Sequence, residues 1–194
     1  PDRQETFFQN VIIPGISLLP SISSHRWLAR EELKNVVPST EISFPRGYSI
    51  SKPTTGHVPR ELVAAQLRRD HRSFLRAPKY ALNLVENLIY QKCLGGPFIT
   101  LTTRELIRGD YNEGRTIKKC VWQDVFTKLK ETNITPIIVR DTMNAHSPPL
   151  FKDVIEVPEA SIHLPLRMAL YEQALINFTK NNLYCSLTTS YIDT

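Results

Sequence analysis

Two apolar runs and the helix between them decide the fold: Phe98-Ile99-Thr100-Leu101-Thr102 comes first and Ile134-Thr135-Pro136-Ile137-Ile138-Val139 follows. Each run has the length and the β-branched content of a short buried strand. The segment between them predicts a helix from Thr116 to Asn133, because its apolar residues form one stripe. The stripe consists of Ile117, Val121, Trp122, Val125, Phe126 and Leu129. A strand, a helix and a strand in this order predict a parallel crossover unit, and therefore an α/β fold.

The flanking sequence extends this unit in both directions. Before it, Pro78 begins a helix over residues 79–90, which Gly95-Gly96 ends. After it, Val154–Val157 predicts a third strand, and residues 165–180 predict a helix that is apolar nearly all round and therefore buried. Residues 184–189 are a candidate fourth strand. We expect a parallel sheet with helices packed against it.

Composition restricts the function only weakly. The chain has 194 residues, 41% of them hydrophobic, and a formal charge of +5, which fits an ordinary surface as well as an anionic ligand. Its cysteines, Cys93, Cys120 and Cys185, lack the spacing of a metal site, so we expect reduced core thiols in a cytosolic protein. The apolar run Val11–Leu19 is broken by Pro14 and is too short to span a bilayer.

The chain begins at Pro1 without an initiator Met and stops at Asp193-Thr194. We expect it to be a piece of a longer protein. The proline- and glycine-rich sequence before residue 60 and the change in pattern near Arg76 suggest a domain boundary. We therefore predict two parts, residues 1–76 as the end of one domain with its crossover, and residues 77–194 as most of a second domain.

Charged residues gather in the three segments that follow the predicted strands. These segments are residues 103–115, 140–145 and 158–163, which we expect to be exit loops on one edge of the sheet. Arg115 and Arg167 lie near predicted helix starts, where a cation opposes the helix dipole at a cost of about 0.3–1 kcal/mol. A bound anion would offset that cost. Alternatively, these side chains point into water or pair with Glu105, Asp110 and Glu113.

Several familiar sites are absent from the sequence. It contains neither GxGxxG nor GxxxxGK[ST], so the ordinary dinucleotide and P-loop patterns are missing.

Residues 60–76 carry Arg60, Arg68, Arg69, Arg72 and Arg76 on a helical pattern. That pattern fits a helix that binds nucleic acid, but a solvated basic face without aromatic residues for stacking is the simpler interpretation.

Short motifs along most of the chain resemble uncharacterised glycosyltransferase-like proteins of bacterial surface-polysaccharide gene clusters. The resemblance rests on Asn10–Pro14, Leu19–Ser21, Gly47-Tyr48, Lys52–Thr54, Leu75–Pro78, Phe98–Glu105, Arg115, Ile137–Thr142, Pro158–Ala160, Leu166–Asn177 and Asn181-Asn182. Those proteins look like members of the GT-B architecture, in which two Rossmann-like domains face each other across a cleft. This chain departs from their Asn-Asn-Gly-Pro pattern, because Leu183-Tyr184 follows Asn181-Asn182.

The resemblance implies a nucleotide-sugar-dependent glycosyltransferase that needs no metal and no other cofactor. Its Rossmann-like second domain would bind the donor. Arg104 and Arg115 would hold the donor diphosphate, with Arg167 behind them as additional positive charge. Arg140 would be a further donor-binding residue. Asp141 and Glu172 would bind nucleoside or sugar hydroxyls, and Glu105 would be the carboxylate near the reacting carbon.

The implied partners are a nucleotide sugar and a glycan or lipid-linked acceptor, without a specific nucleic acid. The implied location is cytoplasmic, with peripheral attachment to the inner membrane left open. Two other classes also stay open: a non-catalytic Rossmann-like binding or scaffold protein, and a basic nucleic-acid-binding module over residues 60–76.

Overall fold

A computed structural model describes residues 5–6, 8–20, 22, 25, 32, 75–93, 95–103, 105 and 119–179. The chain divides into two compact units, Pro1–Ile22 with Ser73–Thr194, and Ser23–Arg72. Only His25 and Glu32 of the second unit are among the described residues. The predicted basic helix therefore lies outside them, apart from its last residues Leu75 and Arg76.

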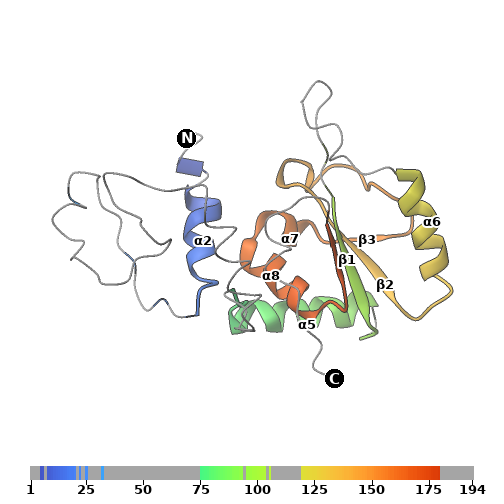
Figure 1. The fold of residues 1–194 in the computed structure, drawn as a ribbon, viewed down its shortest axis with the longest axis horizontal. Coiled ribbons are helices and arrows are strands. Elements are labelled where there is room, and N and C mark those ends of the chain that lie inside the picture. The colour runs from blue at the N-terminus through green and yellow to red at the C-terminus, as the bar shows by residue number, and fades with distance from the viewer. Residues whose placement is uncertain are drawn as a thin grey trace, which may run out of the picture. The chain divides into compact units, whose positions relative to one another are not determined.

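The first unit is built on a parallel four-stranded sheet with the strand order β3-β2-β1-β4 (Figure 1). The strands are β1 (Phe98–Thr102), β2 (Thr135–Val139), β3 (Ile155–Glu156) and β4 (Asn177–Thr179). Strand β2 contains Pro136, which has no N–H to donate. The proline is tolerated because β3 pairs only with Ile137 and Ile138, so β2 has a neighbour on one side at Pro136. The expected α/β class and parallel sheet are confirmed.

Helices cover both faces of the sheet. On one face, α5 (Lys79–Cys93), α7 (Pro158–Ile162) and α8 (Leu164–Gln173) share a buried cluster with Phe98, Ile137 and Val139. On the other face, α6 (Lys119–Leu129) packs with Phe126 against Leu101, Ile138 and Phe151. The split follows from the pleat, because neighbouring residues such as Ile137 and Ile138 point to opposite faces. The sheet is thus a central layer between two helical layers.

The side of α6 that faces the sheet differs by one residue from the expected stripe. Val121 is 52% exposed, whereas Trp122, Phe126 and Leu129 pack against the sheet. A shift of one position turns a helix by about 100°, so the apolar residue next to the stripe is left in water. Cys120 lies in the same exposed stretch, which makes the expected burial of this thiol wrong. The side chain of Cys93 and all of Cys185 lie outside the described residues.

The chain after β3 differs most from the expected elements. The predicted exit loop 158–163 is instead the short helix α7, which Pro158 begins from its first turn. Helix α8 ends at Gln173 rather than near residue 180, and β4 occupies residues expected to be helical. The candidate strand at 184–189 lies outside the described residues. Pairing with β1 therefore overrides the local helical pattern at Asn177–Thr179.

An N-terminal segment packs with the sheet-bearing unit. A π-helical turn, η1 (Phe8–Ile12), runs directly into α2 (Ile13–Ile16), with Pro14 in the first turn of α2. Leu18 is 1% exposed and belongs to the same buried cluster as α5 and α8. Its carbonyl accepts a hydrogen bond from the Arg76 N–H at 2.7 Å. That residues 1–76 are the end of a separate first domain stays a prediction, but Leu18 packs in the core of the unit that carries the sheet.

No helix in the described part of the chain has the length and apolar character needed to cross a membrane.

Candidate functional site

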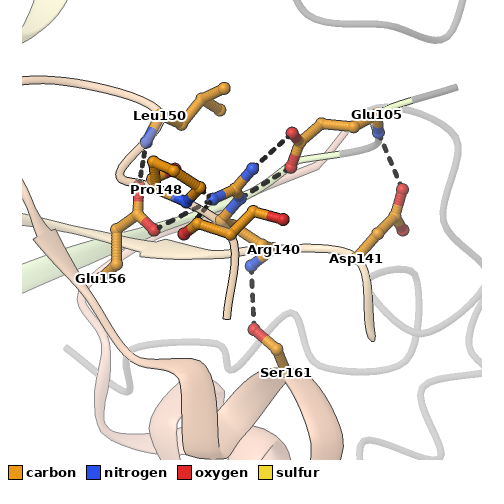
Figure 2. A network of polar contacts seen from close by, with 8 residues as sticks. Glu105, Arg140, Asp141, Pro148, Leu150, Glu156 and Ser161 are labelled. Carbon is orange, nitrogen blue, oxygen red and sulfur yellow. Dashed lines mark hydrogen bonds and ion pairs between the residues drawn. The ribbon is translucent and has the colours of Figure 1, made fainter. Parts of the chain in front are cut away.

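The carboxyl ends of β1 and β2 bring together charged residues that are far apart in the sequence. Thr102 pairs with Val139, so the residues that follow the two strands leave the sheet side by side. Glu105 follows β1, and Arg140 and Asp141 follow β2. All three were expected near the sheet edge, and they are in direct contact (Figure 2).

Arg140 is the centre of this cluster and is only 5% exposed. Its Nε donates to Oε1 of Glu105 at 2.8 Å and its Nη2 donates to Oε2 of the same carboxylate at 2.6 Å. Its Nη1 donates to the carbonyls of Ser147 at 3.1 Å and Pro148 at 2.7 Å, and lies 3.7 Å from Glu156 Oε2. The planar guanidinium thus forms a two-pronged bond with one carboxylate and holds the 147–148 turn with its other side.

The electrostatics of the cluster favour a permanently charged guanidinium. The hydrogen bond with Glu105 raises the pKa of Arg140, burial opposes this effect, and the nearby negative charges of Glu105 and Glu156 raise the pKa further. A buried arginine with this many partners is costly to disturb, because loss of one partner leaves another charge unpaired in a region of low dielectric.

Backbone groups extend the cluster to the neighbouring segments. The Asp141 carboxylate accepts a hydrogen bond from the Glu105 N–H at 2.8 Å, which fixes the chain just beyond β1. The Arg140 N–H donates to Ser161 Oγ of α7 at 3.1 Å, and Glu156 Oε1 accepts from the Leu150 N–H at 2.6 Å. The exits of three strands are therefore joined by one polar network, which we call the Arg140 cluster: Glu105, Arg140, Asp141, Glu156 and Ser161.

Arg167 does not join the Arg140 cluster through a side-chain contact with its acids. Its Nε donates to the Ala160 carbonyl at 2.7 Å and its Nη2 donates to the Ser161 carbonyl at 2.6 Å. These carbonyls belong to α7, whose carboxyl end carries partial negative charge. Arg167 lies in the first turn of α8, but its side chain caps the carboxyl end of α7. A bound anion is therefore not needed to explain a cation at this position.

Glu172 lies on α8 and contacts the chain that leads into α5. Its Oε1 accepts a hydrogen bond from the Ala77 N–H at 2.7 Å. Burial raises the pKa of the Glu172 carboxyl, while the bond from Ala77 and the charge of Arg76 lower it. Among the described residues, the hydrogen bonds and ion pairs of Glu172 do not include a member of the Arg140 cluster. A role in binding donor hydroxyls stays a prediction.

We expect Glu172→Gln to flatten the pH dependence of stability. The folded protein holds the Glu172 proton more tightly than the unfolded chain does, so this group favours folding at low pH. Its contribution is lost as the pH rises from the ordinary carboxyl pKa of about 4.3 through the raised folded value. Gln keeps the acceptor oxygen for Ala77 but cannot ionise. Thermal midpoints at several pH values should show wild type losing stability relative to Glu172→Gln as the pH rises. Parallel profiles would contradict this expectation, and Glu159→Gln at an exposed position controls for the lost charge.

A row of hydroxyl groups in the core was not predicted from the sequence. Thr100 is fully buried and Thr102 is 4% exposed, and both side chains point to the same face of β1. Thr100 bonds to Asn177 of the neighbouring strand β4, and Thr102 bonds to Tyr171 of α8. Thr102 Oγ1 lies 2.5 Å from the hydroxyl of Tyr171 on α8. Threonine at alternate positions of an otherwise apolar strand, together with one tyrosine in an apolar helix, was the available signal. The signal was not specific enough to predict which groups would pair.

Two of the predicted donor-binding residues, Arg104 and Arg115, lie outside the described residues. Among the residues that are described, no group of three or more His, Cys, Asp or Glu side chains is arranged to hold a metal ion.

Comparison with known proteins gives no match for this chain. No protein-family model, no curated protein and no solved structure is similar to it at a significant level. The resemblance to surface-polysaccharide glycosyltransferases therefore stays a prediction that rests on the motifs in the sequence.

Proposed function

We propose that this chain contains the donor-binding part of a nucleotide-sugar-dependent glycosyltransferase of GT-B architecture, which transfers a sugar to a surface glycan or a related lipid-linked acceptor. The observation that supports the proposal best is the order of the parallel strands. Within the sheet, β2 and β3 lie on one side of β1, and the chain then returns to form β4 on the other side of β1. In open parallel sheets, ligands bind outside the carboxyl ends of the strands where the order reverses in this way.

The segment with the predicted donor-binding arginines follows directly from this point in the sequence. Arg104 lies between the described residues Thr103 and Glu105, and Arg115 follows before α6 begins at Lys119. In the proposal, Arg104 and Arg115 bind the diphosphate of the donor. Such forks neutralise the charge that develops on the leaving diphosphate and need no metal ion to do so.

The Arg140 cluster takes a different role from the one expected from the sequence. The charges of Arg140 and Glu105 are bonded to each other, and Asp141 is bonded to the backbone of Glu105. In the proposal, Arg140 and Asp141 are positioning residues that fix where the chain leaves β1. Both oxygens of Glu105 accept bonds from Arg140, so direct action at the reacting carbon would require this ion pair to open.

We expect saturable binding of one nucleotide among GDP, UDP, ADP and CMP, weakened more than about tenfold, or 1.4 kcal/mol, by Arg104→Ala. The reason is the loss of a charge-assisted bond to the diphosphate. Isothermal titration calorimetry measures the affinity, and it also identifies the base. Lys128→Ala, which removes an exposed cation from α6, should leave the affinity unchanged.

Two results would count against the proposal in different ways. If the folded chain binds none of the four nucleotides, the donor-site proposal is wrong for this chain. If a nucleotide binds equally well to wild type and Arg104→Ala, the chain binds nucleotides without the proposed diphosphate contact, as a binding or scaffold protein would.

A further inference from the structure

The seam between β1 and β4 contains a ladder of paired polar groups. Thr100 Oγ1 donates to Asn177 Oδ1 at 2.5 Å, and Asn177 Nδ2 donates to the Tyr171 carbonyl at 2.9 Å. One step further along β1, Thr102 Oγ1 and the Tyr171 hydroxyl share a hydrogen bond. The buried hydroxyls of this seam are thus satisfied from its middle towards its carboxyl end.

The pairing stops at the carboxyl end itself. Among the residues that the structure describes, the buried side-chain oxygens without a hydrogen-bond partner are Thr103 Oγ1 and Thr179 Oγ1. Thr179 is the last residue of β4 and pairs in register with Thr102, and Thr103 is the next residue of the chain. Thr103 is only 1% exposed. Buried polar groups are normally paired, so two unpaired hydroxyls at the ends of two adjacent strands call for an explanation.

Their position suggests that the missing partner is a ligand. Both hydroxyls lie at the reversal of strand order between β1 and β4, where open parallel sheets bind their ligands. Because side chains alternate along a strand, Thr103 and Thr179 belong to opposite faces of the sheet. A group that meets both hydroxyls must therefore lie outside the strand ends rather than over one face.

We propose that the hydroxyls of Thr103 and Thr179 donate hydrogen bonds to the oxygen atoms of a phosphate group bound at the carboxyl end of the β1–β4 seam. The identification of that phosphate as part of a nucleoside diphosphate rests on the proposed function. A phosphate offers several strong acceptors around one centre, so it can accept from two sides at once. The hydroxyls are then unpaired because they serve the ligand-bound state.

Replacing each threonine by valine tests the proposal, because valine keeps the shape and removes the hydroxyl. In the ligand-free protein, Thr103→Val and Thr179→Val should leave the thermal midpoint unchanged or raise it by about 2–4 °C, since an unpaired polar group is lost. Each variant should weaken the binding of inorganic pyrophosphate and of the preferred nucleoside diphosphate by about tenfold or more. The matched control, Thr100→Val, removes a paired hydroxyl from the same strand. It should lower the midpoint and leave the affinities unchanged.

Serine variants separate the hydroxyl from the methyl group and cover the case in which a valine variant does not fold. Thr103→Ser and Thr179→Ser should keep the affinity for pyrophosphate. Their thermal midpoints should fall, because the buried methyl group is lost.

The outcomes distinguish this inference from the proposed function. If nucleotides bind equally to wild type and both valine variants, the inference is wrong and the proposed function stands. If the valine variants lose thermal stability and keep their affinities, the hydroxyls bind ordered water or protein groups, and the inference is wrong. It is also wrong if pyrophosphate does not bind to wild type. If pyrophosphate needs both hydroxyls but no nucleotide binds more tightly than pyrophosphate, the inference stands and the proposed function is wrong.

Discussion

Arg140→Met is expected to lower the free energy of unfolding by about 3–5 kcal/mol, the range for breaking a buried ion pair by removal of one partner. The substitution leaves the Glu105 and Glu156 carboxylates without their shared cation, and it also removes two bonds to backbone carbonyls. Urea denaturation followed by circular dichroism measures the loss. The variant Arg140→Lys, which keeps the charge but not the planar fork, should fall between wild type and Arg140→Met.

An exposed ion pair in the same unit provides the control. Lys130 lies 4.0 Å from Asp153, and their side chains are 58% and 64% exposed. Lys130→Ala should change the free energy of unfolding by less than about 1 kcal/mol, as is usual for surface pairs. A change at Arg140 as small as that at Lys130 would show that the Arg140 cluster is not a structural element. Partial recovery in Arg140→Met with Glu105→Gln would show that the unpaired charge accounts for part of the loss.

Phe126→Ala is expected to cost about 3–5 kcal/mol, because it leaves a cavity between α6 and the sheet. Phe126 is 1% exposed, and its ring lies 5.0 Å from that of Phe151 and 6.0 Å from that of Trp122 between centroids. It is the residue of α6 most completely enclosed by the core on that face of the sheet. In urea denaturation, the free energy of unfolding in water should fall, while the m value, the dependence of that free energy on urea concentration, should not change.

Val121→Ala tests whether position on the helix, rather than apolar character, determines this cost. Val121 lies on the same helix and is 52% exposed, so its truncation should cost less than about 1 kcal/mol. Similar losses at Phe126 and Val121 would mean that α6 packs through a different side.

The sequence predicted the central unit well because each of its elements carries its own local signal. The runs at 98–102 and 135–139 are β-branched and short, and an amphipathic helix separates them. A parallel crossover satisfies all three patterns. The bounds of α6 and the side that it buries were less well defined, because Val121 and Trp122 are adjacent apolar residues and periodicity alone does not choose between them.

Strand β4 could not be predicted because its signal is tertiary. Residues 174–179 continue an apolar helical pattern from α8, yet the helix ends at Gln173 and the next residues pair with β1. The bonds that determine this, from Thr100 N–H to the Ile176 carbonyl and from Leu175 N–H to the Phe98 carbonyl, join segments more than seventy residues apart in the sequence. Local propensity contains no information about such a partner.

The candidate site was predicted in composition but not in pairing. The sequence indicated that Glu105, Arg140 and Asp141 would meet at one edge of the sheet, and they do. It did not reveal that Arg140 would be buried and saturated by Glu105 and backbone carbonyls, because that depends on the turn at 147–148 and on where β3 ends. The unpaired hydroxyls of Thr103 and Thr179 emerge only once the register of β1 and β4 is known.

In the proposed function, the carboxyl edge of the sheet binds a nucleoside diphosphate at the junction of β1 and β4. Its most direct test is a two-dimensional amide NMR titration of the assigned chain with the nucleotide that binds most tightly. We expect the largest shifts at Thr102, Thr103, Glu105 and Thr179, with smaller shifts at Arg140 and Asp141. Shifts concentrated at the opposite edge of the sheet, near Gly96 and Ile134, or on the outer face of α5, would show that the ligand does not bind at this junction.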